Sequence, residues 1–179
     1  VTGVQTCALP ICTDKTGTLT QNKMTVVREH TDDPRLMAAA MALCSDAELA
    51  PGEERSTGEP TEAALVDYAY KLGLPRYELT VSQPRVAEAP FDSDRKMMST
   101  VHKTDEGFIQ YTKGAPDEIL KKCTQAIVAG KTVSMTDDIR KDILRANKAM
   151  ADRALRVLAV SLRQYKKEQA EVKRLTETA

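Results

Sequence analysis

The chain has 179 residues, of which 41% are hydrophobic and 29% charged, with 26 basic and 26 acidic side chains and a formal net charge of zero. This length suits one sizeable domain, or one domain and a piece of another, and the balanced charge gives no basis for expecting a nucleic-acid partner. The longest near-apolar run, residues 36–44, is far shorter than the roughly 20 residues of a membrane-spanning helix, and the cysteines lack the spacing of a zinc site or disulfide framework.

Residues 1–11 are predicted to lie outside the fold. Pro10 would remove a ladder hydrogen bond from a central strand, and the whole run resembles the translation of a common sequencing-library adapter. We therefore interpret residues 1–11 as a library artefact, with a genuine divergent strand as the alternative. On this interpretation the native sequence begins at about Cys12.

The next segment, Asp14–Thr20, has the composition of a phosphoryl-transfer loop. It places the carboxylate of Asp14 beside a cation, Lys15, and beside the hydroxyl of Thr16. A carboxylate nucleophile that attacks a phosphoryl group splits one difficult displacement into two easier steps. The neighbouring cation and hydroxyls can offset charge on the transferring oxygens. The alternative interpretation is a polar turn after a strand.

This segment resembles the phosphorylation motif of the P-type cation-transporting ATPases, which belong to the haloacid-dehalogenase superfamily. In the wider superfamily a second Asp, acting as general acid/base, follows the nucleophile by two positions, whereas this chain has Thr16 there, as the pumps do. The resemblance implies a persistent aspartyl-phosphate at Asp14, with Lys15 and Thr16 in the catalytic loop. It continues through Gln21–Val26, as in the calcium-pump-like branch.

The remaining segments predict antiparallel strands flanked by helices, an α/β (α+β) fold without internal repeats. Turn residues separate the elements, and Asp33, Pro60 and Thr136 mark helix starts. The predicted strands are 24–30, 85–91, 96–103, 108–113 and 155–162, and the predicted helices are 34–43, 60–73, 115–122 and one that follows Thr136. Residues 130–132 resemble the end of a P-loop, but Gln125 stands where that motif needs glycine, so we predict a turn.

This layout resembles the nucleotide-binding domain of the same pumps. The resemblance implies three parts after the artefact: residues 12–23 as the start of the phosphorylation domain, 24–164 as the nucleotide-binding domain, and 165–179 as a charged tail or linker.

Two segments resemble nucleotide-binding motifs of the pumps. Gly58–Leu65 resembles their acidic helix start, which implies that Glu62 accepts a hydrogen bond from the exocyclic amine of adenine. The alternative role for Glu62 is favourable charge at a helix N-terminus. Tyr111–Asp117 matches the family's Lys-Gly-Ala motif, in which Lys113 reaches into the pocket and Gly114 permits close approach of the backbone to the ligand. The alternative there is a strand-to-helix turn with a solvated lysine.

Two further segments are expected to reach the base and the phosphates. Pro90–Ser99 resembles the segment in which an aromatic ring, here Phe91, stacks on adenine and a cation, here Lys96, reaches the phosphates. Core packing is the alternative for Phe91. Arg156 lies in an otherwise apolar strand and needs a partner or an exposed edge; the resemblance supplies the nucleotide phosphates as that partner.

The resemblance therefore implies part of an ATP-driven cation pump, with Ca²⁺ as the expected cation. The cofactors are ATP and Mg²⁺, the latter bridging the γ-phosphate, the Asp14 carboxylate and the Thr16 carbonyl. The parent is expected to be an integral membrane protein whose transmembrane and actuator domains are missing here, with this segment soluble on the cytoplasmic face. Alone, the segment is expected to bind ATP weakly without turnover. The alternatives are a soluble phosphatase of the same superfamily, which Thr16 disfavours, and a non-catalytic nucleotide-binding module.

Overall fold

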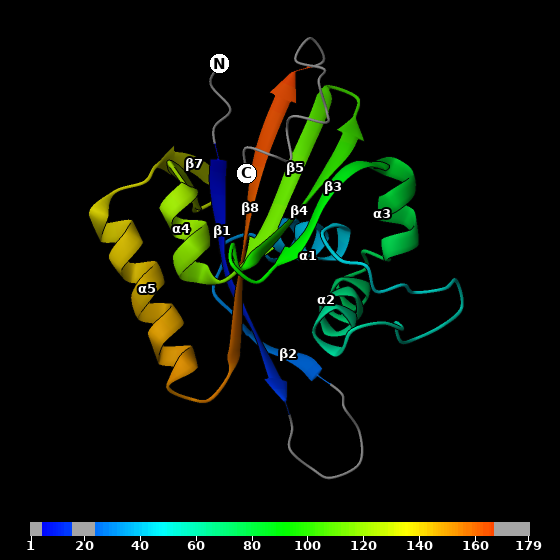
Figure 1. The fold of residues 1–179 in the computed structure, drawn as a ribbon, viewed down its shortest axis with the longest axis horizontal. Coiled ribbons are helices and arrows are strands. Elements are labelled where there is room, and N and C mark those ends of the chain that lie inside the picture. The colour runs from blue at the N-terminus through cyan, green and yellow to red at the C-terminus, as the bar shows by residue number, and fades with distance from the viewer. Residues whose placement is uncertain (1–4, 16–23, 167–179) are drawn as a thin grey trace.

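The structure, a computed structural model, describes residues 5–15 and 24–166, and only the backbone of residues 5–15. One twisted sheet runs through the described part, with strand order β3-β4-β5-β8-β1-β6-β7 and β2 paired to β1 (Figure 1). The strands are β1 (Gln5–Lys15), β2 (Met24–Glu29), β3 (Arg85–Asp92), β4 (Met97–Thr104), β5 (Gly107–Gly114), β6 (Gln125–Val128), β7 (Lys131–Ser134) and β8 (Arg156–Lys166). The helices are α1 (Pro34–Leu43), α2 (Pro60–Lys71), α3 (Arg76–Ser82), α4 (Pro116–Lys122) and α5 (Asp137–Ala151).

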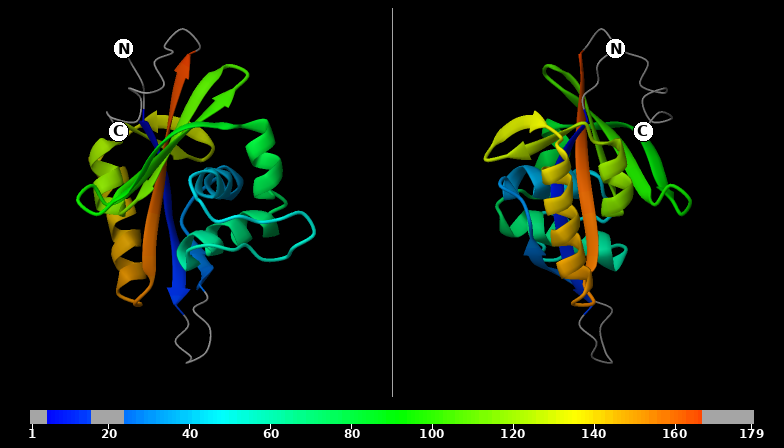
Figure 2. Two further views of the ribbon diagram at one scale, coloured as in Figure 1. Left: turned by 45° about the vertical axis from the view of Figure 1, so that its right-hand side comes forward. Right: turned by 90° about the vertical axis from the view of Figure 1, so that its left-hand side faces the viewer.

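Helices cover both faces of this sheet. Figure 2 shows α1, α2 and α3 on one side and α4 and α5 on the other, so the molecule has three layers. The pairings along β3-β4-β5-β8-β1 are all antiparallel, and among the described strands only β1 and β6 pair in parallel. This arrangement confirms the predicted fold class, an antiparallel sheet flanked by helices.

The helix starts follow from local sequence. Asp33 accepts a hydrogen bond from the Leu36 amide at 2.9 Å and so caps α1, and Thr136 accepts one from Ile139 at 3.3 Å and caps α5. Pro34 occupies the first turn of α1, where a missing N–H costs nothing. These caps satisfy amides that have no partner within the helix, and they explain why the two starts were predictable.

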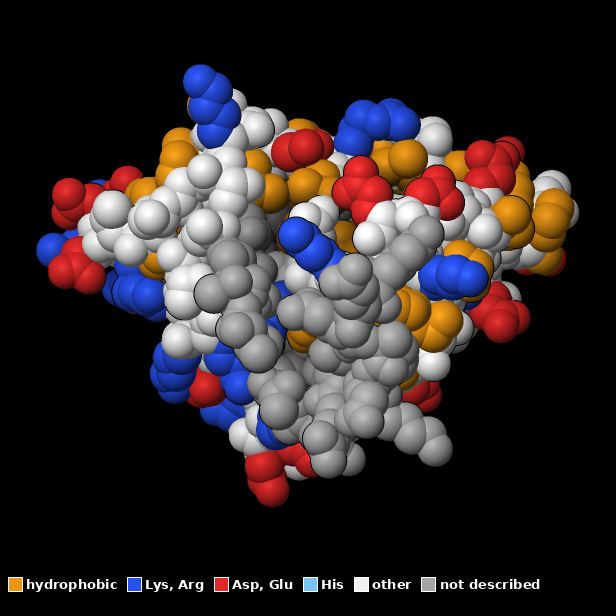
Figure 3. All heavy atoms as spheres, turned by 90° about the horizontal axis from the view of Figure 1, so that it is seen from above, with side chains coloured by type: hydrophobic (Ala, Val, Ile, Leu, Met, Phe, Trp, Pro, Cys, Tyr) orange, Lys and Arg blue, Asp and Glu red, His pale blue; other side chains and the backbone are white. Residues whose placement is uncertain are grey.

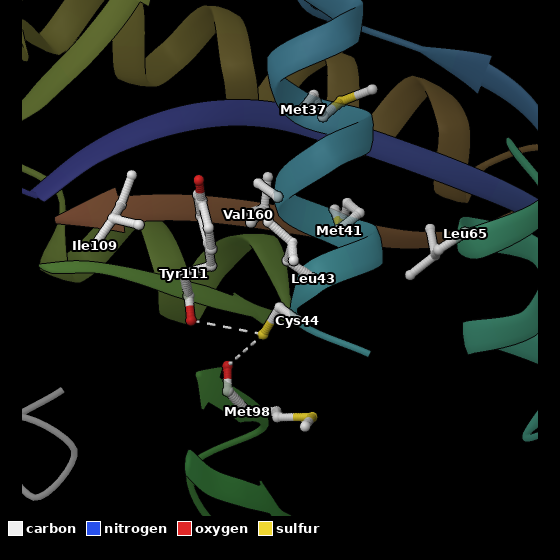
Figure 4. Packing of buried hydrophobic residues seen from close by; sticks show 10 residues of the cluster. Met37, Met41, Leu43, Cys44, Leu65, Met98, Ile109, Tyr111 and Val160 are labelled. Carbon is white, nitrogen blue, oxygen red and sulfur yellow. Dashed lines mark hydrogen bonds between the residues drawn. The ribbon is translucent and has the colours of Figure 1, made fainter. Parts of the chain in front are cut away.

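The largest described core cluster joins α1 to the sheet. Met37, Met41 and Leu43 of α1 are fully buried and face Tyr111 of β5 and Val160 of β8 (Figure 4). The close-up also shows the thiol of Cys44 directed at the carbonyl oxygens of Met98 and Tyr111, which lie 3.6 and 3.5 Å from Sγ. Burial raises the pKa of this thiol. The C-terminal end of α1 is thereby fixed against β4 and β5.

The structure gives residues 5–15 a strand conformation, which the exclusion of residues 1–11 did not anticipate. β1 pairs antiparallel with β8 from Gln5 to Thr13, with a register shift between Ala8 and Ile11. That shift brackets Pro10, which has no amide hydrogen to donate to a regular ladder. The backbone agrees with the alternative of a divergent strand. The artefact interpretation itself concerns the origin of the sequence and stays a prediction.

Besides β1, three described elements were absent from the sequence prediction: α3, β6 and β7. Helix α3 begins after Pro75 without a side-chain cap, and the β6–β7 hairpin turns at Ala129 and Gly130, both with positive φ. The turn predicted at 130–132 is thus confirmed at its first residue, whereas the two short strands around it were missed. β8 continues to Lys166, two residues into the predicted tail; the rest of that tail lies outside the described residues.

The described surface carries both signs of charge. On the face seen in Figure 3, acidic and basic side chains are interspersed with small hydrophobic areas. No helix in the described part of the chain combines the length and apolar character needed to cross a bilayer.

Candidate functional site

The strand register brings three sequence-distant segments, the β3–β4 turn, the end of β5 and the start of β8, to one end of the sheet. Asp92 at the end of β3 pairs with Met97 at the start of β4. Met97 in turn pairs with Gly114 at the end of β5, and Gly114 pairs with Ala159 near the start of β8. Because these strands are antiparallel, the predicted site residues Phe91, Lys96, Lys113, Gly114 and Arg156 all belong to this end of the sheet.

Glu62 and Lys113 form a shielded ion pair at this end. The ammonium of Lys113 lies 2.5 Å from Glu62 Oε1, and the two side chains are 8% and 16% exposed. Lys113 also donates to the hydroxyl of Ser45 at 2.9 Å. The second carboxylate oxygen of Glu62 accepts from the amides of Asp46 at 2.7 Å and Ala47 at 3.3 Å. The structure therefore brings together two residues that were predicted from separate motifs for the nucleotide pocket.

The loop that holds Glu62 is itself fixed by two arginines. Arg85 donates to the carbonyl oxygens of Leu43 and Ser45 at 2.9 and 2.6 Å, and Arg76 donates to Ser45 at 2.8 Å. Carbonyls at a helix C-terminus have no intrahelical partner, and cations are favourable there. Arg85 also pairs with the Asp46 carboxylate at 2.7 Å.

Sequence reasoning missed these supporting residues. Ser45 and the two arginines are separated by 31 and 40 positions in the chain, and no local pattern indicates that α1 ends where both guanidinium groups can reach it.

Phe91 and Lys96 lie in or beside the β3–β4 turn. The ring of Phe91 is 65% exposed, so core packing, the alternative considered for it, does not account for the residue. Lys96 is also exposed and has a left-handed backbone, with φ of 55°. Asp92 holds the turn, since its carboxylate accepts from the amides of Asp94 and Arg95 at 2.9 and 2.8 Å. These hydrogen bonds lower the pKa of Asp92.

Gly114 makes its close approach to the chain itself. A Cβ at this position would overlap the carbonyl oxygen of Lys96 and would lie 2.7 Å from Cβ of Met97. The next amide, that of Ala115, donates to the same Lys96 oxygen at 3.0 Å. This described contact is with the β3–β4 turn; the predicted close approach of Gly114 to a ligand stays a prediction.

Arg156 is exposed at the first position of β8 and reaches the N-terminus of α2. Its guanidinium donates to Thr61 Oγ1 at 2.8 Å. Thr61 directly precedes Glu62 in α2, so Arg156 contacts the residue that adjoins the Glu62–Lys113 ion pair in sequence. β8 lies between β5 and β1, so Arg156 is not on an edge strand; its predicted contact with the nucleotide phosphates stays a prediction.

The predicted catalytic loop is described only in part. Asp14 and Lys15 end β1 in the sheet, where Asp14 is opposite Thr25 of β2, and nothing is described of their side chains. Thr16 lies outside the described residues. The predicted magnesium ligands, the Asp14 carboxylate and the Thr16 carbonyl, are therefore not observed. No group of three His, Cys, Asp or Glu side chains gathers elsewhere in the described segments.

Comparisons with known proteins agree on one family. A family model described as P-type ATPase, cytoplasmic domain N, matches residues 34–178. Calcium-transporting ATPase 1 of Bacillus cereus is 41% identical over 181 aligned positions, which cover 93% of this chain and 20% of that protein. Calcium-transporting ATPase 1 of Lactococcus lactis is 43% identical over 162 positions, which cover 83% of this chain and 18% of that protein.

The similarity extends to a transporter of other ions. The sodium/potassium-transporting ATPase subunit alpha-4 of Rattus norvegicus is 29% identical over 169 positions, which cover 76% of this chain and 16% of that protein. The chain thus spans about a fifth, at most, of the length of these relatives.

Proposed function

Since this chain belongs to the P-type cation-transporting ATPases, we propose that residues 24–166 bind ATP as the nucleotide-binding domain of a calcium-transporting pump. The observation that carries this proposal is the shielded pair of Glu62 and Lys113, with an exposed aromatic side chain, Phe91, at the same end of the sheet. A carboxylate, a cation and an aromatic face are the groups that recognise a purine base and keep it in one orientation.

Glu62 retains capacity for one more donor. A carboxylate has about four lone-pair sites, and the structure fills three of them with Lys113 and the amides of Asp46 and Ala47. An exocyclic amine such as that of adenine can use the fourth. Guanine presents a carbonyl oxygen at the equivalent position, and an acceptor facing a carboxylate is repelled. We therefore propose that the site prefers ATP to GTP.

Phe91 and the two outer cations complete the proposed site. A base stacked on an aromatic side chain gains about 1–3 kcal/mol in nucleic-acid-binding proteins, and the Phe91 ring is exposed enough to stack. Lys96 and Arg156 are both exposed at the same end of the sheet, where an anionic triphosphate can meet them. Arg156 would exchange its hydrogen bond with Thr61 for one with a phosphate.

In the parent pump, we propose that Asp14 is the residue phosphorylated by the bound ATP. Mg²⁺, when bound, would neutralise charge on the phosphates; the carboxylate of Asp14 and the carbonyl of Thr16 would hold it. Lys15 would stabilise the oxygens of the group being transferred. The transported cation is proposed to be Ca²⁺, because the two bacterial relatives described above are named calcium-transporting. The domain would lie on the cytoplasmic face of the membrane.

A nucleotide competition experiment tests the binding proposal. The purified chain is titrated with ATP and with GTP by isothermal titration calorimetry, and the titrations are repeated on Glu62→Gln. We expect saturable ATP binding with weaker GTP binding, and we expect the variant to lose most of this preference because an amide can face either base. Equal affinities for both nucleotides in the wild-type chain would contradict the role of Glu62.

The nucleophile is tested separately in a full-length relative. Asn at the position of Asp14 should abolish acid-stable phosphoenzyme formed from labelled ATP, because an amide cannot attack the γ-phosphate. Labelling that survives this change would contradict the assignment. For the chain alone we propose binding without turnover, so a robust rate of ATP hydrolysis by the purified chain would contradict that part of the proposal.

A further inference from the structure

We infer that Gly114 and Ala115 are positioning residues, which place Lys96 relative to the Glu62–Lys113 pair. They do so by holding the carbonyl group of Lys96, and we call this contact the clasp. This inference rests on the proposed ATP site and adds a device that couples its base-binding and phosphate-binding parts. It concerns the junction between the β3–β4 turn and the β5–α4 connection, two segments that the sequence placed in separate motifs.

The clasp has two components on consecutive residues. The amide of Ala115 donates to the carbonyl oxygen of Lys96 at 3.0 Å. Gly114 leaves room for that oxygen, since a Cβ there would overlap it and would also press on Met97. Gly114 itself is not in the left-handed region, so a turn conformation does not explain the glycine. The close approach of the two backbones does explain it.

The same junction fixes the backbone of Lys96 from the other side. The Lys96 amide donates to the Asp92 carbonyl at 2.7 Å, and Lys96 has φ of 55°. Non-glycine residues are strained in this region and stay there only when their surroundings hold them. With its amide and its carbonyl both engaged, Lys96 has a fixed Cα direction although its side chain is exposed.

The base-binding end of the junction is equally rigid. Lys113 immediately precedes Gly114, and its ammonium is held by Glu62 and Ser45. One peptide segment, Lys113–Ala115, therefore carries a buried cation at one end and clasps the backbone of an exposed cation at the other. This segment therefore sets the distance between the Lys113 ammonium and the backbone that carries Lys96. A site that binds both adenine and the phosphates of one ATP needs these two parts at a defined spacing.

A comparison of ATP with adenosine isolates this effect. Adenosine uses the base-binding part alone, so the ratio of the two dissociation constants measures what the phosphate-binding cations add. Gly114→Ala should push the Lys96 carbonyl away, and we expect ATP affinity to fall about tenfold while adenosine affinity changes less than about twofold. A variant that merely loosens the fold would weaken both ligands together.

Two further variants keep the test decisive. Ala115→Pro removes the clasping N–H at a residue whose φ of −62° suits proline, and it should reduce the same ratio if Gly114→Ala does not fold. In a Lys96→Ala background, Gly114→Ala should have no further effect on the ratio, because the group being positioned is gone. Gly73→Ala is the matched control, since it strains a glycine with φ of 72° where no atom lies within 4 Å; its ratio should equal that of the wild type.

The outcomes separate this inference from the proposed function. If the wild-type chain binds neither ATP nor adenosine, the proposed function fails and the inference fails with it. If the wild type binds both, but the clasp variants weaken ATP and adenosine equally, the inference alone is overturned. An additive effect of Gly114→Ala in the Lys96→Ala background would also overturn it.

Discussion

The ammonium of Lys113 and the carboxylate of Glu62, 51 positions apart in the chain, meet at 2.5 Å in a shielded part of the molecule. Glu62 lies in the first turn of α2, on one face of the sheet, and Lys113 comes from the end of β5. Their contact therefore ties a helix N-terminus to the sheet at the place where the site residues gather. Loss of one partner leaves the other charge without its counterion in partly desolvated surroundings, which is costly.

Lys113→Met should destabilise the fold by about 2–4 kcal/mol, because Glu62 loses its only described counterion while keeping its shielded place. The measurement is urea unfolding followed by circular dichroism. Lys121→Met is the control: Lys121 pairs with Glu118 but is 65% exposed, so its loss should have little effect. Equal midpoints for the two variants would show that the Glu62–Lys113 pair does not stabilise the fold.

Phe91→Ala should weaken ATP binding about tenfold through lost stacking without lowering the unfolding midpoint, because the ring is 65% exposed. Phe91→Tyr keeps an aromatic face and should restore affinity. The matched surface control is Val81→Ala on α3, where an 81% exposed side chain is removed and ATP affinity should stay unchanged. A large loss of stability in Phe91→Ala would instead indicate a packing role.

Two substitutions of Lys96 should weaken ATP binding equally but differ in their effect on the stability of the fold. Lys96→Gly and Lys96→Ala both remove the ammonium, and we expect both to weaken ATP to the same extent. Only glycine relieves the left-handed backbone at φ of 55°, so Lys96→Gly should be more stable than Lys96→Ala by about 1 kcal/mol. Thermal unfolding by calorimetry measures the difference. If the alanine variant were the more stable, the conformation of Lys96 would carry no strain.

His102 should make the fold sensitive to mild acid. The side chain is fully buried, its Nδ1 lies 2.8 Å from the Gln83 carbonyl and its Nε2 lies 2.9 Å from Thr100 Oγ1. A carbonyl can only accept, so Nδ1 carries the hydrogen and Nε2 accepts from the threonine in the neutral ring. Burial lowers the pKa of His102 from 6.5 to about 4.

Because the pKa of His102 is lower in the folded chain than in the unfolded chain, acid should destabilise the fold. Between pH 6.5 and about 4 the unfolded chain binds a proton at His102 that the folded chain does not, so stability falls as the pH falls. The contribution is complete above 6.5, and its loss by pH 4 amounts to up to about 3 kcal/mol. The free energy of unfolding in urea can be measured for the wild type and for His102→Gln at pH 7 and at pH 4.5. The loss of stability between the two pH values should be smaller in the variant. Identical differences would exclude His102 as the titrating group.

The sequence predicted the elements with strong local signals and missed those without them. Asp33, Pro60 and Thr136 are helix-start residues whose hydrogen bonds or fixed φ act within one turn, and all three starts were placed correctly. The β6–β7 hairpin was missed because its turn begins with Ala129, whose φ of 50° is unusual for alanine. Helix α3 was missed because it is short and has no capping side chain.

For the site, sequence resemblance selected residues and the fold supplied their relationships. Glu62 and Lys113 were predicted from separate motifs, and only strand register and the placement of α2 bring them into contact. The supporting contacts of Arg85 with the end of α1 depend on the same tertiary packing. The contact of Gly114 with Lys96 was not predictable from the sequence, because a glycine alone does not say which neighbouring group needs the space.

The most direct test of the ATP site is an NMR titration of the isotopically labelled chain with ATP. We expect saturable shifts of the amide resonances of Asp46, Glu62, Lys96 and Ala115, and no shift in the distant β6–β7 hairpin. Phe91→Ala should move the titration midpoint to higher ATP concentration. The absence of saturable shifts, or shifts that cluster away from this end of the sheet, would contradict the proposal that the chain binds ATP here.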